Sequence, residues 1–132
     1  MAKFDNQICL IADDYSTARR LINNSLQQIG FSCLEAENGN QAKALINQTS
    51  LDLVIADVNM PEKKGLELLK DIRTDDNMKD LPVDLTMHEP FEDLIIEAKK
   101  LGMNDYLVKP FDVFTLSKTL DKVIKTTGGE SL

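Results

Sequence analysis

The chain has 132 residues, of which 42% are hydrophobic, and a formal net charge of −7. This length and composition predict one globular domain with its own core and argue against a disordered chain. The negative charge argues against direct binding to nucleic acid or to an anionic membrane, because both need a basic surface. Cys9 and Cys33 lack metal-binding spacing and are expected to be reduced core thiols.

Membrane insertion and secretion are also not expected. No apolar run approaches the roughly 18 residues needed to cross a bilayer. The first residues, Met1 to Asp5, lack the long apolar segment of a signal peptide. The sequence therefore predicts a cytoplasmic protein.

Short apolar runs and helical patterns alternate five times along the chain. The runs that we predict to be strands span residues 8–12, 31–36, 53–57, 81–87 and 106–108. Segments with helical periodicity follow them at residues 16–29, 41–48, 66–72, 90–101 and 111–125. Ser16 and Thr17 are expected to cap the first helix, and Pro90 suits the first turn of the fourth. Leu21 and Phe114 are expected to face inward.

This alternation predicts an α/β fold. Repeated strand–helix units give a parallel sheet with right-handed crossovers and helices on both faces. The runs at 8–12 and 53–57 are the most apolar and should be central, whereas the mixed polarity of 31–36 suggests an edge strand. We expect a single domain over residues 1–132, with its core at about 8–125 and a frayed tail at 126–132.

Charged residues follow three of the predicted strands. Asp13 and Asp14 follow the first, Asp57 ends the third, and Lys109 follows the fifth. Each alone is more typical of a turn or a helix cap. Parallel strands, however, place their carboxyl ends at one edge of the sheet, where such folds bind ligands. We therefore expect three carboxylates and one ammonium group to share a pocket.

The chemistry of this set favours phosphoryl transfer. Clustered carboxylates repel one another, and a hard divalent cation such as Mg²⁺ neutralises them. A lysine supplies a mobile positive charge that can follow an anion. A cation, a lysine and a carboxylate nucleophile together are suited to accepting a phosphoryl group.

The motifs resemble those of the response-regulator receiver domains, the family of the chemotaxis regulators. The matching stretches are residues 11–14, residues 57–61 with Gly65, and residues 105–111. The resemblance covers nearly the whole chain and implies a flavodoxin-like sheet in the order 2-1-3-4-5. It also implies a cis bond between Lys109 and Pro110.

The resemblance assigns a role to each site residue. Asp57 would accept the phosphoryl group, and Lys109 would contact it. Mg²⁺ would be held by Asp13 or Asp14, by Asp57 and by the backbone carbonyl of Asn59. The chain would not be an enzyme beyond promoting its own phosphorylation and dephosphorylation.

The resemblance also implies partners and an output. A histidine kinase or phosphotransfer protein of a two-component system or phosphorelay would donate the phosphoryl group. A downstream protein would bind the face formed by the fourth helix, the fifth strand with Tyr106, and the last helix. The new charge at Asp57 would act on that face through a strand-four hydroxyl and the strand-five aromatic residue.

Strand four departs from the family pattern. Counting from Asp57 and Lys109 places Met87 where the family has a switch hydroxyl, and Thr86 lies one residue earlier, on the other face of a regular strand. His88 stands where a small residue is usual, and Asp84 interrupts an apolar strand.

Three interpretations of this strand are open. The strand could slip or bulge so that Thr86 becomes the switch. The domain could accept phosphate but couple it weakly to its output. The strand and the next helix could be displaced so that Asp84 meets water. We predict a local distortion, and we expect His88 to be a solvated loop residue near the pocket mouth.

Two other functions compete with the phosphoacceptor. The unusual strand four would also suit a pseudo-receiver that recognises a partner without phosphorylation. An aspartyl-phosphate phosphatase of the haloacid-dehalogenase type would need a second Asp two residues after the nucleophile. Asn59 occupies that position, which argues against a hydrolase.

Overall fold

The computed structural model describes residues 4–124, in which five strands alternate with five helices. The strands are β1 (Ile8–Ala12), β2 (Ser32–Ala36), β3 (Leu53–Asp57), β4 (Val83–Met87) and β5 (Asp105–Val108). The helices are α1 (Ser16–Gln28), α2 (Gly39–Gln48), α3 (Gly65–Arg73), α4 (Glu92–Leu101) and α5 (Val113–Asp121). The predicted alternation is confirmed.

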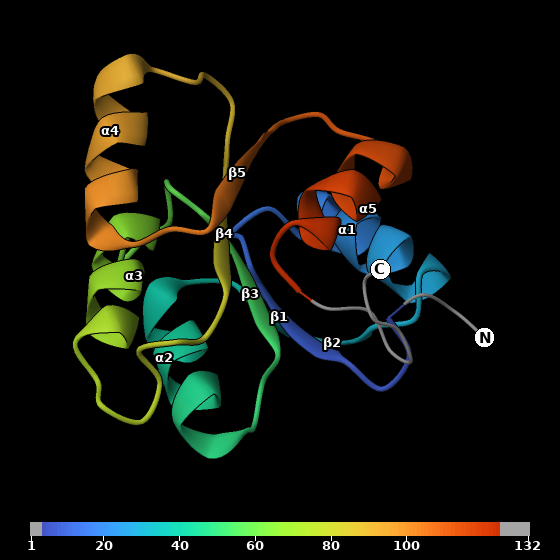
Figure 1. The fold of residues 1–132 in the computed structure, drawn as a ribbon, viewed down its shortest axis with the longest axis horizontal. Helices are drawn as coiled ribbons and strands as arrows, with labels where there is room; N and C mark the ends of the chain where they lie inside the picture. The colour runs from blue at the N-terminus through green and yellow to red at the C-terminus, as the bar shows by residue number, and fades with distance from the viewer. Residues whose placement is uncertain (1–3, 125–132) are drawn as a thin grey trace.

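The strands form one parallel sheet in the order β2-β1-β3-β4-β5. Helices α1 and α5 cover one face, and α2, α3 and α4 cover the other (Figure 1). The predicted flavodoxin-like α/β fold is therefore confirmed, with β2 at one edge and the apolar β1 and β3 inside.

The sheet divides the core into two halves, because alternate side chains of each strand point to opposite faces. The half under α1 and α5 contains, among others, Cys9, Ile11, Ile22, Leu26, Leu53, Ile55, Leu107, Leu116 and Leu120. The half under α2, α3 and α4 contains, among others, Leu10, Val54, Ala56, Leu68, Leu69, Val83, Leu85, Met87 and Ala98.

The helix ends differ from the predicted ones. Tyr15, not Ser16 or Thr17, is the N-cap of α1, and Pro90 lies before the N-cap of α4. Helix α5 begins only at Val113, because the Asp112 side chain caps it by accepting a hydrogen bond from the Thr115 N–H at 2.8 Å. The predicted helix end at 125 and the tail at 126–132 lie outside the described residues.

Two apolar side chains that were expected to face inward are exposed. Leu21 is 63% exposed and Phe114 is 66% exposed. In α1 the fully buried positions are Ile22 and Leu26, and Leu21 lies beside them at the rim of a hollow described below. In α5 the Lys118 ammonium lies 5.0 Å from the Phe114 ring centroid, on the outside of the helix.

Strand β4 is regular, so the predicted distortion is wrong. Its residues pair in register with β3 and β5, and all five are buried. Asp84 is 0% exposed, and neither carboxylate oxygen has a hydrogen-bond partner. Burial, and then the nearby Asp105 carboxylate, raise the pKa of Asp84 from 3.8 to about 7. A protonated carboxyl is far less costly to bury than a charged one, and the strand can therefore stay straight.

A single arginine ties the end of α3 to the turns that precede β4 and β5. Arg73 donates hydrogen bonds from Nη1 to the Leu81 carbonyl at 2.7 Å and from Nε to the Gly102 carbonyl at 3.0 Å. Its Nη2 donates to Asn104 Oδ1 at 2.9 Å, and this oxygen also accepts the Val83 N–H at 2.8 Å. One side chain therefore fixes both of these turns to the end of α3.

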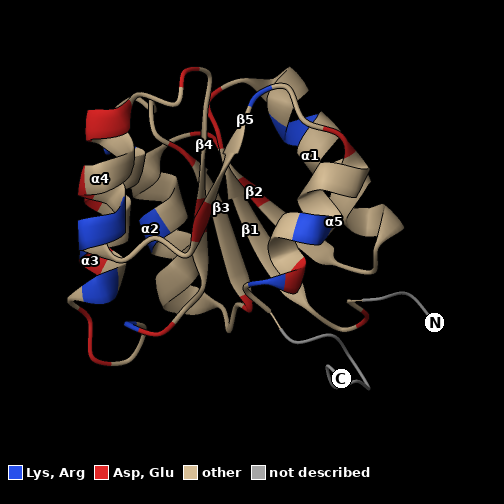
Figure 2. Cartoon of the chain, turned by 45° about the horizontal axis from the view of Figure 1, so that its top comes forward, with Lys and Arg blue, Asp and Glu red and all other residues tan. Residues whose placement is uncertain are grey.

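The basic side chains of the described residues are dispersed. In Figure 2 the lysines and arginines are scattered over several helices and are not gathered on one face. Among residues 4–124, no helix has the length and apolarity needed to cross a membrane.

Candidate functional site

The carboxyl ends of β1, β3 and β5 bring the predicted residues together. Asp13 directly follows β1, Asp57 is the last residue of β3, and Lys109 directly follows β5. The two aspartates are almost fully buried, with Asp13 1% and Asp57 6% exposed. Asp14, by contrast, is exposed to solvent.

Asp13 is held by its backbone and by its side chain. Its N–H donates to the Ala36 carbonyl at 3.0 Å, and its own carbonyl accepts from Arg19 Nη1 at 2.6 Å. Its Oδ1 accepts the Tyr15 N–H at 2.9 Å. Arg19 is in turn paired with Glu35 at 3.0 Å. The loop after β1 is therefore anchored to β2 and α1, which leaves Asp13 little freedom to move.

Asp57 is positioned by the turn that follows it. Its Oδ1 accepts the Asn59 N–H at 3.0 Å. Gly65 packs so closely beneath this turn that an added Cβ would lie 2.4 Å from the Asp57 carbonyl oxygen. A glycine at the start of α3 thus lets the turn sit directly on the helix.

Lys109 joins the two buried aspartates. Its Nζ donates to Asp13 Oδ2 at 2.5 Å and to Asp57 Oδ2 at 2.8 Å. Burial alone would lower the pKa of Lys109, but the hydrogen bonds and charges of both carboxylates outweigh it and raise the pKa above its ordinary value. Lys109 is therefore charged. The Lys109–Pro110 peptide bond is cis, as the resemblance implied.

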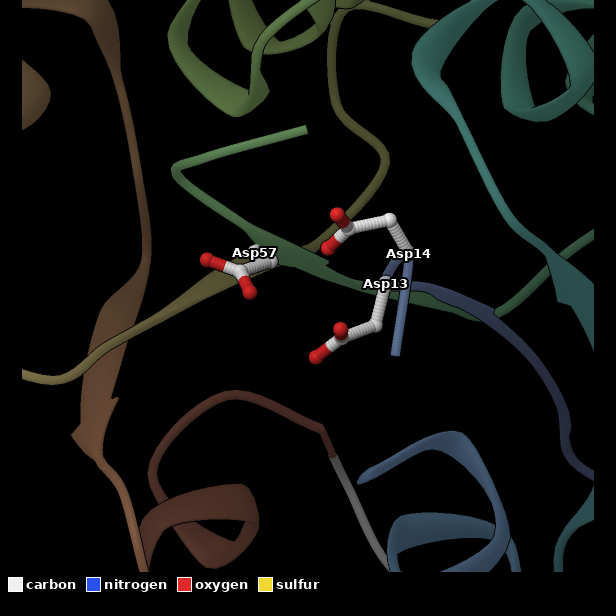
Figure 3. A group of neighbouring side chains, drawn as sticks. All are labelled: Asp13, Asp14 and Asp57. Carbon is white, nitrogen blue, oxygen red and sulfur yellow. The ribbon is translucent and has the colours of Figure 1, made fainter. Parts of the chain in front are cut away.

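The three carboxylates surround a common space, as Figure 3 shows. One oxygen from each of Asp13, Asp14 and Asp57 lies within 4.8 Å of the others. This all-oxygen donor set fits a hard divalent cation such as Mg²⁺, which needs only one or two carboxylates and completes its shell with carbonyl oxygens and water. Asp14, being exposed, can turn toward an ion without breaking a buried contact.

The register of β4 separates the two candidate switch residues. Thr86 is the partner of Asp57 in the β3–β4 ladder, and its buried hydroxyl has no hydrogen-bond partner. Met87 points to the other face and belongs to the core half under α4, against which half-buried Tyr106 also packs. The site thus has Thr86 on the sheet face of Asp57, whereas Met87 lies on the opposite face, level with Val108 of β5.

Sequence reasoning missed a small hollow next to Lys109. It has a volume of about 240 Å³ and is lined mainly by apolar atoms of α1 and of the loop after β5, including Leu21, Ile22, Pro110 and Phe111. His88 and Lys109 complete its wall. His88 is exposed, which confirms its predicted place in a loop near the pocket mouth. Leu21 has the sequence spacing of a residue on the inner face of α1, so the sequence did not indicate that it lines a surface hollow.

Comparison with known proteins places these features in one family. The family model of the response regulator receiver domain matches residues 9–121. Chemotaxis protein CheY-3 of Vibrio cholerae is 42% identical over 121 residues, which cover 91% of this chain and 93% of that protein.

Solved structures agree with this assignment. Chemotaxis response regulator CheY4 of Vibrio cholerae superposes with a TM-score of 0.84 at 33% identity, covering 89% of this chain and 98% of that one. The Mn²⁺-bound form of response regulator Rcp1 gives a TM-score of 0.73 at 26% identity, covering 86% and 88% of the two chains. This chain belongs to the response-regulator receiver domains of two-component signalling systems.

Proposed function

We propose that this chain is a phosphoacceptor that receives a phosphoryl group on Asp57 from a histidine kinase or a phosphotransfer protein. The observation that carries the proposal is the contact of the Asp57 and Asp13 carboxylates with one charged lysine, Lys109, at the sheet edge. A nucleophilic carboxylate beside a fixed positive charge is suited to a reaction that depends on positioning and charge neutralisation.

In the transfer step an Asp57 carboxylate oxygen forms a bond to phosphorus. The P–N bond of the donor phosphohistidine breaks, and the imidazole leaves with the bonding electron pair. Lys109, which already contacts Asp57 Oδ2, would donate to the new phosphoryl oxygens. In the separate hydrolytic step, water attacks phosphorus, the electron pair of the Asp57 O–P bond returns to the carboxylate, and inorganic phosphate leaves. The chain would thus catalyse only its own modification and its removal.

A divalent cation fits this site. Asp13, Asp14 and Asp57 would bind it through carboxylate oxygens, and Asn59 through its backbone carbonyl. When bound, Mg²⁺ would supply charge that neutralises the phosphoryl oxygens. The solved Mn²⁺-bound form of response regulator Rcp1 supports binding of a divalent cation by this fold.

The output face would be formed by α4, β5 and α5. Phe91 and Ile96 on the α4 side and Phe114 on α5 are large apolar side chains exposed to solvent. Exposed aromatic side chains are typical anchors of protein interfaces. A downstream protein partner would bind there, and phosphorylation would change its affinity.

Phosphorylation-independent binding is the alternative, and β4 is the observation that favours it. Met87 fills the position where the family has a hydroxyl, and the hydroxyl of Thr86 has no partner. A pseudo-receiver would use the same face without a change at Asp57. Thr86 as the switch hydroxyl remains a prediction.

The test is incubation with a small phosphodonor and Mg²⁺, followed by intact-mass measurement. We expect the mass gain of one phosphoryl group, absent in Asp57→Asn and retained in Asp71→Asn, whose carboxylate pairs with Lys63 away from the site. No gain in the wild-type chain would reject the phosphoacceptor.

A second measurement separates switching from plain binding. In a Tyr15→Phe background, Tyr106 is the only tyrosine, so its fluorescence reports on β5. Phosphorylation that changes this fluorescence supports the switch. Phosphorylation that leaves it unchanged supports weak coupling and the pseudo-receiver interpretation.

A further inference from the structure

Asp84 is the second residue of β4, on the face of the sheet that α1 and α5 cover. In the strand ladders it is level with Ile55 of β3 and Asp105 of β5, and Ile55 belongs to the core half beneath those helices. The side chain is completely buried, and both of its oxygens lack a hydrogen-bond partner. A buried, unpartnered carboxyl in the central part of a sheet is rare in folded proteins and calls for an explanation.

The charged groups near Asp84 come from β5, α5 and β1. On β5, the partly buried Asp105 carboxylate lies level with it. On α5, Lys122 Nζ lies 3.4 Å from Asp105 Oδ2, and its side chain is 71% exposed. On β1, the Cys9 thiol has a raised pKa, first because of burial and then because of Cys33 and Asp84. The buried cluster in this half of the core is otherwise apolar and includes Ile22, Leu26, Ile55, Leu116 and Leu120.

These surroundings oppose a negative charge on Asp84. Burial is the main reason that its pKa rises to about 7, and the Asp105 carboxylate raises it further. The Asp105 backbone N–H, which approaches the carboxyl, and the charge of the Lys122 ammonium act in the opposite direction but are outweighed. Neither carboxyl oxygen has a partner in good hydrogen-bond geometry. These surroundings tolerate the neutral, protonated carboxyl better than the charged one.

Loss of the proton requires the surroundings to change. β4 cannot move easily, because it is paired along its length with β3 and β5. The C-terminal end of α5 is the freer element, since the helix ends at Asp121 and Lys122 is its largely exposed C-cap. An ionised Asp84 would be relieved if this end separated from the sheet and admitted water, or if the Lys122 ammonium turned inward to pair with it.

We propose that Asp84 is a proton switch that controls the packing of the C-terminal end of α5 on the sheet. With the proton bound, α5 stays packed on β5. Without the proton, the last turn of α5 loosens, and the Lys122 ammonium leaves the Asp105 carboxylate and pairs with the Asp84 carboxylate. The end of α5 that responds belongs to one of the three elements of the proposed output face, so the regulator would respond to pH near neutrality as well as to its phosphoryl group. The switch does not depend on Asp57 and stands apart from the proposed function.

The test follows the whole chain, labelled with ¹³C at its aspartate carboxyl carbons, by NMR from about pH 5 to about pH 9, a range that brackets neutrality. We expect the Asp84 carboxyl carbon to titrate with a midpoint of about 7. Amide hydrogen exchange in α5, corrected for its intrinsic pH dependence, should accelerate with the same midpoint.

Three variants identify the group responsible. Asp84→Asn keeps a neutral side chain of the same size, and α5 should then stay protected over the whole range. His88→Gln removes the only histidine of the chain, and the transition should persist. Asp105→Asn should move the midpoint to lower pH without abolishing the transition.

The proposal is overturned if the Asp84 carbon titrates in the ordinary carboxyl range, or if the exchange transition persists in Asp84→Asn or vanishes in His88→Gln. If Asp84→Asn fails to fold, the wild-type chain alone decides. The Asp84 carbon titration and the α5 exchange transition are then measured on one sample. Coinciding midpoints support the proposal, and different midpoints overturn it.

Discussion

The electrostatics of the site depend on a single residue. Lys109 is the cation that contacts both buried aspartates, and its side chain is only 11% exposed. Removing one partner of a buried ionic cluster leaves the others uncompensated, which costs more than the cluster itself contributes. Lys109 therefore has a structural role before any phosphoryl group arrives.

Replacing Lys109 tests this role. Lys109→Met should lower the free energy of unfolding by roughly 3 kcal/mol in the absence of divalent cations. Mg²⁺ should restore part of the loss, because it neutralises the same carboxylates. Urea denaturation with and without Mg²⁺ measures both effects. Lys63→Met is the control, because Lys63 pairs with Asp71 at 2.7 Å on the surface and should cost at most about 1 kcal/mol. Equal losses in the two variants would contradict the prediction.

His88 is the second residue with a testable effect. It is exposed and shares the wall of the 240 Å³ hollow with Lys109, where the family pattern has a smaller residue. His88→Ala should speed phosphorylation by a small phosphodonor severalfold, because it widens the approach to the site. The rate of phosphoprotein formation by intact-mass measurement tests this, with Glu89→Ala in the same exposed loop as the control. A slower reaction in His88→Ala would indicate that the imidazole assists the donor instead.

The sequence predicted which residues meet at the site, but not which of the two adjacent aspartates points into it. Parallel strands bring Asp13, Asp57 and Lys109 to one edge, and this follows from topology alone. Whether Asp13 or its neighbour Asp14 turns inward depends on the direction of the backbone after β1, which is set by bonds to Ala36 and Arg19. Adjacent identical residues carry no pattern that distinguishes them.

At the level of elements, the approach of α3 to the turn after β3 is unusually tight. A Cβ on Gly65 would lie 2.4 Å from the Asp57 carbonyl oxygen and 2.9 Å from the Val58 Cα, both backbone atoms that cannot turn aside. The start of α3 and the position of Asp57 are therefore coupled through a residue without a side chain.

Gly65→Ala should accordingly destabilise the protein, although alanine is the better helix former. We expect a loss of roughly 1–3 kcal/mol, typical of overpacking, together with slower phosphorylation of Asp57. Thermal unfolding and intact-mass measurement report the two effects. Lys70→Ala, at an exposed position of the same helix, is the control for helix propensity. Unchanged stability in Gly65→Ala would show that the turn after β3 can move away from α3 and make room for the added methyl group.

The elements themselves were predictable because each buried strand is a short aliphatic run between turn residues. Which side of each helix faces the sheet was harder to predict. Apolar residues at helical spacing outnumber the positions that the sheet can cover, and Leu21 and Phe114 are the surplus. The distortion expected in β4 was wrong because it assumed an ionised Asp84, whereas a neutral carboxyl leaves the ladder intact.

For the whole molecule, Asp84 predicts how stability depends on pH. Its pKa is about 7 in the folded state and near 3.8 when unfolded, so the folded chain binds the extra proton between these values. The contribution of Asp84 to the free energy of unfolding should therefore be largest below about pH 4, fall as the pH rises to about 7, and stay level above it. At about 1.4 kcal/mol per pH unit, the contribution is of the order of 4 kcal/mol.

Urea denaturation across this range, compared with Asp84→Asn, isolates the contribution of this carboxyl from those of other acidic groups. The difference in unfolding free energy between the variant and the wild type should shift in favour of the variant as the pH rises from about 4 to about 7. Asp84→Leu should make the protein more stable than the wild type above pH 7. A difference that does not vary with pH would contradict the predicted pKa of Asp84.

The three bonds of Arg73 have a mechanical consequence for α4. They fix Gly102 and Asn104, at the C-terminal end of that helix, to the end of α3. The N-terminal end of α4, by contrast, has an exposed residue, Phe91, as its N-cap and follows the loop that leaves the site. Any displacement of α4 would therefore be a pivot about its last residues, largest at Phe91. Hydrogen exchange that rises steadily from residue 101 back to residue 92 would reveal this hinge, and uniform exchange along α4 would exclude it.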